Sequence, residues 1–118
     1  MRNIGGRVTP EVLRSWQLLG RLGRPAEGSR SGGDPPHMVV LHHTDCGIMR
    51  LADPPDRLAE FFEIPVDDLE AKAVFDPYAS VRIDVDIVRR TLGTGFLVSG
   101  LVYDVATGLI EIVVPPTT

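Results

Sequence analysis

The chain has 118 residues, of which 43% are hydrophobic and 24% charged, and this composition suits one globular domain and excludes a disordered chain. Its formal net charge at pH 7 is -4, and without a basic cluster to neutralise phosphates we expect no nucleic-acid partner. The longest apolar run, 96–103, is far shorter than the ~20 residues of a membrane-spanning helix, so we also expect no membrane partner and a cytoplasmic location.

The first expected element is a helix that ends near Arg21. Thr9 is suited to the N-cap position and Pro10 to the first helical position. Apolar residues then follow at helical spacing, namely Val12, Leu13, Trp16, Leu19 and Leu22. The segment 23–36 consists largely of glycine, proline and serine, which predicts a flexible surface loop.

A short apolar run, 38–42, predicts a strand that is buried on both faces. This strand delivers His43 and Cys46 at its C-terminal end, where open α/β sheets bind ligands. Because side chains alternate along a strand, His42 is expected to face away from His43. Two short helical pieces, 55–62 and 66–74, are expected next.

The segment 81–92 is ambiguous. Its first residues alternate like a strand, whereas Val81, Val85, Val88 and Leu92 fit a helix of period 3.6. Two strands are expected at 95–105 and 109–114, joined by a turn at 106–108, and Pro115 and Pro116 are expected to end the second. The order of elements indicates an α/β fold with a C-terminal β-hairpin.

His43 and Cys46 are candidate zinc ligands, because zinc favours imidazole and thiolate donors and both residues lie at one strand end. Gly47 permits a close backbone approach beside the cysteine, and we expect it to line the same cleft. In the alternative interpretation, Cys46 packs as a small hydrophobic residue and both histidines donate to backbone carbonyls. Spacing alone leaves both interpretations open.

Three blocks of sequence, 2–15 (RNIGGRVTPEVLRS), 39–47 (VVLHHTDCG) and 100–110 (GLVYDVATGLI), resemble the β class of carbonic anhydrases in residue choice and order. The resemblance implies that His43 and Cys46 match two zinc ligands and that Asn3 and Gly5 belong to a cleft-lining Arg-Asn-x-Gly segment. It implies a homodimer of doubly wound α/β protomers, with a helix within 80–92. The implied reaction is the zinc-dependent reversible hydration of carbon dioxide to bicarbonate.

One family motif, Cys-x-Asp-x-Arg, does not occur in the 118 residues. In the family its cysteine is the third protein ligand of zinc, and its Asp-Arg pair acts beside the metal. We therefore expect one partial domain, 1–118, with a sheet that is incomplete at the N-terminus and with 23–36 as a loop insertion. We expect the strand 38–42 to have an unpaired edge. As written, this chain is expected to be inactive, and the alternative is a non-catalytic module for dimerisation or interaction.

The remaining charged residues are expected to have structural or solvated roles. Arg2 and Arg7 are interpreted as solvated surface residues, and the alternative is that they fold back towards the cleft or the missing strand. The carboxylate pairs 67–68 and 84/86 are interpreted as helix caps and solvated faces rather than acid/base pairs.

Overall fold

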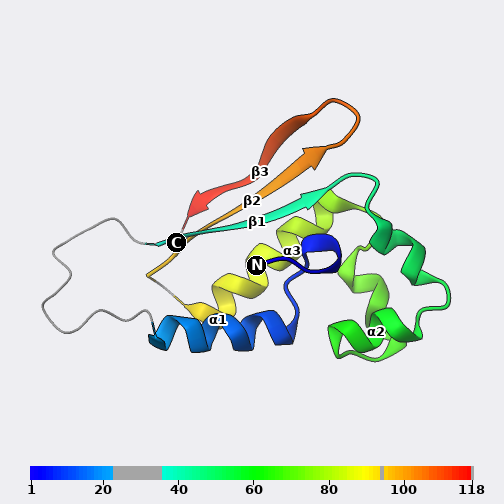
Figure 1. Cartoon of the computed structure of the whole chain (residues 1–118), viewed down its shortest axis with the longest axis horizontal. Coiled ribbons are helices and arrows are strands. Elements are labelled where there is room, and N and C mark those ends of the chain that lie inside the picture. Colours follow the sequence, from blue (N-terminus) through cyan, green and yellow to red (C-terminus); the bar gives the residue numbers. More distant parts are fainter. Residues whose placement is uncertain (23–35, 94, 118) are drawn as a thin grey trace, which may run out of the picture.

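A three-stranded sheet is the centre of the fold in the computed structural model, which describes residues 1–22, 36–93 and 95–117 (Figure 1). Its strands are β1 (His37–His43), β2 (Leu97–Asp104) and β3 (Leu109–Thr117), and they lie in the order β1-β2-β3. β1 and β2 are parallel, and β2 and β3 form an antiparallel hairpin. The predicted α/β class and the C-terminal hairpin are confirmed. The loop predicted at 23–36 falls, apart from Pro36, outside the described residues.

Three α-helices accompany the sheet: α1 (Pro10–Leu22), α2 (Asp56–Phe62) and α3 (Pro77–Leu92). Short 3-10 helices are also present, at η1 (Ile4–Gly6), η2 (Gly47–Ala52) and η3 (Val66–Lys72). The start of α1 is as predicted, since the Val12 amide donates to Thr9 Oγ1 at 3.3 Å. The expected helical piece at 66–74 is the 3-10 helix η3.

α3 resolves the ambiguity of the segment 81–92 in favour of a helix. The Asp76 side chain caps it by accepting from the amides of Tyr78 and Ala79, at 3.1 and 3.2 Å. Val81 and Val85 are buried against the sheet, as helical spacing requires. In an alternating strand Arg82 and Asp84 would lie on the face opposite the two valines, whereas in α3 Asp84 is buried on the same side as the valines.

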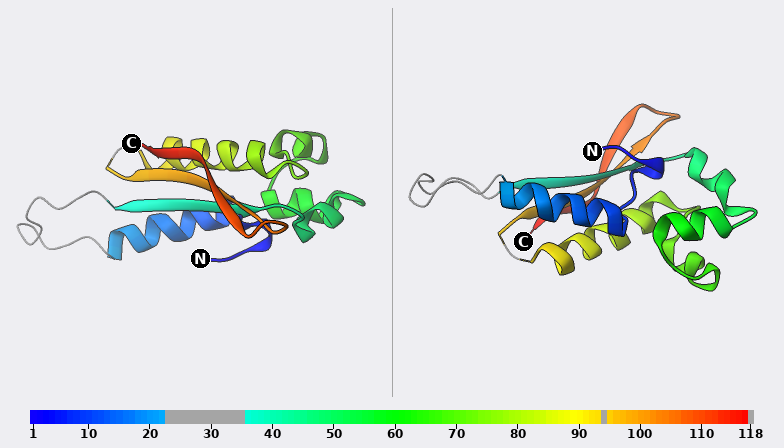
Figure 2. Two further views of the ribbon diagram at one scale, coloured as in Figure 1. Left: turned by 90° about the horizontal axis from the view of Figure 1, so that it is seen from above. Right: turned by 60° about the horizontal axis from the view of Figure 1, so that its bottom comes forward.

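α1 and α3 pack on the same side of the sheet, as Figure 1 shows, and seen from above they run lengthwise along the strands (Figure 2). We call this side the covered face. α3 approaches β2 closely at Gly100, where a Cβ atom would lie 2.9 Å from Val85 Cγ2 and 3.0 Å from Val81 Cγ2. Only glycine leaves room for that contact without a shift of the helix. Leu19 of α1, expected on the apolar side, is instead half exposed.

The opposite side of the sheet is exposed in the part of the chain that the structure describes. Burial alternates along β1, with Met38, Val40 and His42 buried and with Val39 and Leu41 47% and 48% exposed. We call the side of Val39 and Leu41 the open face. The strand register places these further residues on it: His43, Leu101, Tyr103, Ile110 and Ile112. The prediction of a strand buried on both faces is therefore wrong for these residues. β1 is an outer strand of the described sheet, as expected for an unpaired edge.

β3 continues past the two prolines that were expected to end it. It runs to Thr117, which pairs with Val98 across a register shift. β3 is an outer strand of the described sheet, so Pro115 and Pro116 can lack an N–H without breaking a ladder between two neighbours.

A second small core lies beyond the C-terminal end of β1, among η2, α2 and η3. Its buried members are Ile48, Leu58, Phe62, Leu69 and Val74. Because the chain enters this core directly after β1, the core fixes the path of residues 44–47. Among the described helices, none has the length and apolar character needed to span a membrane.

Candidate functional site

A cavity of about 490 Å³ lies between the N-terminal segment, α1 and the edge of β1. Asn3, Gly5 and His43 all line it, together with Arg7 and Tyr103. The structure thus brings two residues of the Arg-Asn-x-Gly segment to the same cavity as one predicted zinc ligand. His43 is the exposed last residue of β1 and lines the cavity from the side of the sheet that we call the open face.

Two glycines allow the N-terminal segment to approach β1 and η2. Gly5 and Gly6 have positive φ angles of 73° and 63°, in the left-handed region that favours glycine. A Cβ atom at Gly6 would lie 2.5 Å from the Leu41 carbonyl oxygen, and one at Gly5 would lie 2.8 Å from Ile48 Cδ1. Both glycines are therefore required by the contacts of this segment as well as by its backbone.

His43 has a geometry that leaves one ring nitrogen available. Its Nδ1 atom lies 2.7 Å from the Thr44 carbonyl oxygen, and a carbonyl can only accept, so Nδ1 carries a proton. In the neutral ring Nε2 then has a free lone pair. Metal-binding histidines commonly donate through the second ring nitrogen in this way, so His43 is suited to bind a metal through Nε2.

Cys46 and Gly47 do not line the cavity. Cys46 is partly buried and packs against the second core, as in the hydrophobic interpretation. A Cβ atom at Gly47 would meet no heavy atom within 4 Å, so packing in the described chain does not require glycine there. That Cys46 is a zinc ligand and that Gly47 lines the cleft both stay predictions.

The residues that the structure describes do not supply a complete catalytic zinc site. They contain no group of three or more histidine, cysteine, aspartate or glutamate side chains placed to hold one metal ion. Catalytic zinc generally has three protein ligands and one open position. His43 and Cys46 offer two suitable donors, and two donors do not fit such a site.

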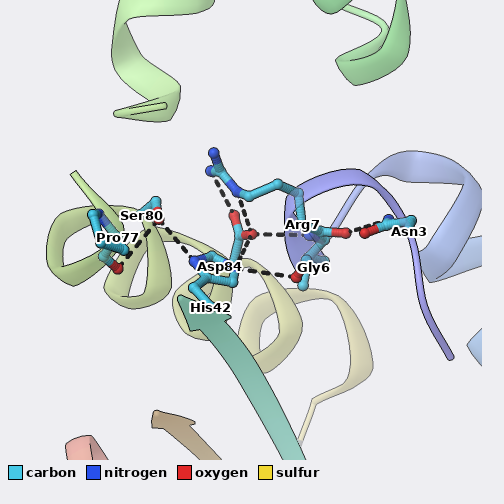
Figure 3. Close-up of polar contacts among 8 residues, drawn as sticks. Asn3, Gly6, Arg7, His42, Pro77, Ser80 and Asp84 are labelled. Atoms are coloured by element: carbon cyan, nitrogen blue, oxygen red, sulfur yellow. Dashed lines mark hydrogen bonds and ion pairs between the residues drawn. The ribbon is translucent and has the colours of Figure 1, made fainter. Parts of the chain in front are cut away.

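His42 faces away from His43, as predicted, and belongs to a buried polar cluster (Figure 3). The cluster consists of Arg7, His42, Ser80 and Asp84 and includes the Gly6 carbonyl and the Val8 amide. Arg7 Nε lies 2.7 Å from Asp84 Oδ2, and His42 Nε2 lies 3.3 Å from the same oxygen. His42 Nδ1 lies 2.7 Å from Ser80 Oγ.

The expectation that Arg7 and Asp84 are solvated is wrong. Arg7 is 3% exposed and Asp84 has no exposed surface. Asp86, the other member of the predicted pair, is exposed and pairs with Arg90 one turn along α3, as expected. Helical spacing carried a signal for Asp84, since it lies three residues after Val81 and four before Val88 on the buried side of α3. The spacing gave no indication of its partner.

The carboxyl of Asp84 stays charged despite its burial. Burial by itself raises the pKa of Asp84, because it penalises the charged form. Hydrogen bonds from His42 and Arg7, the positive charge of Arg7 and the amide of Val8 outweigh that effect, so the pKa of Asp84 is below its ordinary value. The cluster is thus a buried ion pair with added hydrogen bonds.

Known proteins similar to this chain include the curated β-carbonic anhydrase 1 of Mycobacterium tuberculosis and that of Mycobacterium bovis. Each is 31% identical over 123 aligned residues, which cover 98% of this chain and 66% of the relative. The crystal structure of a carbonic anhydrase from Streptococcus mutans has a TM-score of 0.62 and 31% identity, and the match covers 96% of this chain and 64% of that one. The chain thus spans slightly less than two thirds of these relatives. No protein-family model matches the chain.

Proposed function

Because the chain belongs to the β-carbonic anhydrase family, we propose that its cavity takes part in the zinc-dependent reversible hydration of carbon dioxide to bicarbonate. His43 and Cys46 are the two zinc ligands of the proposal, and Asn3, Gly5 and Gly47 are its cleft residues. The observation that carries it is the similarity to β-carbonic anhydrases over 98% of the chain. Composition supports the cytoplasmic location, which stays a prediction.

The proposal assigns no reaction step to the 118 residues alone. They contain one cysteine and no Cys-x-Asp-x-Arg motif, and the described residues offer no third donor beside His43 and Cys46. Two ligands hold zinc weakly and leave its geometry undefined. We therefore expect the 118 residues by themselves to have no hydratase activity. Activity would require a third zinc ligand from protein outside these 118 residues.

Zinc content tests the ligand assignment directly. The gel-filtered 118-residue protein is expected to hold well under about one zinc per chain, and Cys46→Ser and His43→Ala are expected to remove what is bound. His37→Ala is the matched control, because His37 lies on the same strand but bonds Ser99 Oγ at 2.8 Å. About one zinc per chain together with hydration of carbon dioxide would show that the proposed incompleteness is wrong.

The coding sequence upstream of Met1 tests the reaction itself. An in-frame Cys-x-Asp-x-Arg motif, followed by a longer product that binds zinc and hydrates carbon dioxide, is the expected result. A longer product that contains the motif but lacks zinc and activity would refute the proposed reaction, whatever the shorter chain does.

A second candidate function, a dimerising module without catalysis, is favoured by the open face. Its aliphatic residues include Ile110 and Ile112, which are 57% and 62% exposed. Contiguous exposed apolar patches commonly mark interaction sites. A discrete, soluble homodimer without zinc would support this candidate, whereas a monomer at micromolar concentration would contradict it.

A further inference from the structure

Asp84 connects three parts of the chain that are distant in sequence. Its carboxylate accepts from Arg7 Nε at 2.7 Å, from Arg7 Nη2 at 3.1 Å and from the Val8 amide at 2.9 Å. His42 Nε2 lies 3.3 Å from Asp84 Oδ2 and donates to the Gly6 carbonyl oxygen at 3.1 Å. Asp84 thus joins α3 to the N-terminal segment and to β1 (Figure 3).

The contacts continue from Asp84 to both sides of the cavity. On one side, Asn3 Nδ2 donates to the Arg7 carbonyl oxygen at 2.7 Å, so the backbone of Arg7 orients Asn3. On the other side, His42 directly precedes His43 on β1. One carboxylate therefore sets the position of a cleft-lining residue relative to the strand end that carries the predicted ligand.

Among the described residues, few other polar contacts hold the segment 3–8 in place. The backbone bond from the Gly6 amide to the Asn3 carbonyl is internal to the segment. The contacts from it to α3 and β1 are the bonds to Asp84 and the bond from His42 to Gly6. The Arg7 guanidinium also lies over the Phe62 ring, 4.9 Å from its centroid. Loss of the Asp84 charge would leave this buried cation without its anion.

We propose that Asp84 is a positioning residue, which holds the Arg-Asn-x-Gly segment against the end of β1 and so sets the geometry of the cavity. It acts through Arg7 and His42 and contacts no substrate. The term positioning residue rests on the proposed function. The claim that Asp84 holds the segment against β1 can be tested without zinc or activity.

The reactivity of Cys46 can be used to follow the position of the segment 3–8, because Cys46 is the single cysteine of the chain. It occupies the N-cap position of η2, and Gly5 packs against Ile48 of the same short helix. Cys46 packs against the small core that contains Ile48. If Asp84 releases the segment and Gly5 leaves Ile48, we therefore expect that core to loosen and the thiol to become more accessible. The rate at which Cys46 reacts with dithionitrobenzoate under native conditions therefore reports the position of the segment.

The test compares the thiol reaction rate of the wild type with that of Asp84→Asn. The variant is expected to react about tenfold faster or more, at a temperature where circular dichroism shows that it is folded. Asp86→Asn, on the same helix but exposed, is the matched control and should react at the wild-type rate. Val98→Ala controls for general destabilisation, because Val98 is a core residue that pairs with Met38 at the other end of β1.

If Asp84→Asn does not fold, a double variant, Arg7→Met with Asp84→Asn, is used to test whether Asp84 holds the segment. It buries no unpaired charge and keeps an acceptor for the Val8 amide, but it removes the two-bond link between the side chains. A folded variant, single or double, that reacts at the wild-type rate overturns the proposal. So does Val98→Ala if it accelerates the thiol as much as Asp84→Asn. Failure of the proposed reaction leaves this result unchanged, because the measurement involves neither metal nor carbon dioxide.

Discussion

His42 and His43 are neighbours on β1, yet they belong to two different regions of the molecule. His42 lies on the covered face, where it is 2% exposed and bonded through both ring nitrogens. His43 lies on the open face, where its Nδ1 atom donates to the adjacent Thr44 carbonyl. The face of the sheet on which each ring lies, rather than the type of residue, therefore decides how far that ring is buried and hydrogen-bonded.

The same contrast separates the apolar residues of the two faces. On the covered face, Val98 and Val102 of β2 are buried beneath α3. On the open face, residues of the same character, such as Leu41 and Ile112, remain half exposed or more. Substitutions on the covered face should therefore affect the free energy of unfolding, and substitutions on the open face should mainly affect association.

The largest effect is expected for Asp84→Asn. The change leaves the buried Arg7 guanidinium without its anion, and breaking a buried ion pair from one side costs about 3–5 kcal/mol of unfolding free energy. Urea unfolding followed by circular dichroism measures the loss. The exposed counterpart Asp86→Asn should change stability by no more than about 0.5 kcal/mol, and equal losses in the two variants would contradict the assignment.

The stability of the wild type should depend on pH in a direction set by Asp84. Its pKa is lowered in the folded chain, so its contribution is fully present above the unfolded value of about 3.9. The contribution is lost as pH falls through the lower folded pKa, because protonation removes the charge that pairs with Arg7. Urea unfolding at a series of acidic pH values should show a steeper loss in the wild type than in Asp84→Asn. Parallel curves would refute this explanation.

The paired variants His42→Ala and His43→Ala test the comparison between the two histidines. The first removes two hydrogen bonds, to the Gly6 carbonyl and to Ser80 Oγ, although Ser80 keeps its bond to the Pro77 carbonyl, and is expected to cost about 1–3 kcal/mol. The second removes an exposed ring and should change stability by less than about 0.5 kcal/mol. Thermal or urea unfolding of both variants measures the difference, and a reversed order would overturn the assignment of the two faces.

Gly100→Ala tests the close packing of the covered face. The added methyl group would lie within 3.0 Å of side-chain carbons of Val81 and Val85, so α3 must shift. Overpacking of this kind typically costs about 1–3 kcal/mol. Gly20→Ala is a useful control, because a Cβ atom there meets nothing within 4 Å. Equal stability of the two variants in urea would contradict a tight contact at Gly100.

The smallest effect on the folded chain is expected for Ile112→Thr on the open face, at about 0.5 kcal/mol or less. Its visible effect should be weaker self-association, measured by sedimentation at several protein concentrations, because the change makes the exposed apolar surface more polar. Val102→Thr, the matched change on the covered face, buries a hydroxyl and should instead lower stability by about 1–3 kcal/mol. Unchanged association of Ile112→Thr would exclude Ile112 from any contact between copies.

Local signals predicted several features correctly. Thr9 with Pro10 marks a helix start because the capping side chain bonds to an amide only three residues away. The opposite orientation of His42 and His43 follows from strand geometry alone. The family was recognisable from three blocks of residues in order, since such blocks are a property of the sequence itself.

Other features depended on contacts that no local pattern contains. Asp84 and Asp86 are the same residue type two positions apart on one helix, but only Asp84 faces Arg7, 77 residues away in the chain. Pro115 and Pro116 fit inside β3 because that strand lies at an edge of the described sheet.

The sequence by itself therefore determined most of the elements, the resemblance to a family and the alternation that directs His43 to one side and His42 to the other. Only the tertiary structure decided that one face of the sheet is covered, that Arg7 is buried, and that Asp84 joins the N-terminal segment to β1. The physical reason is that burial and ion pairing depend on which distant segments meet, whereas capping and alternation depend on neighbours in the chain.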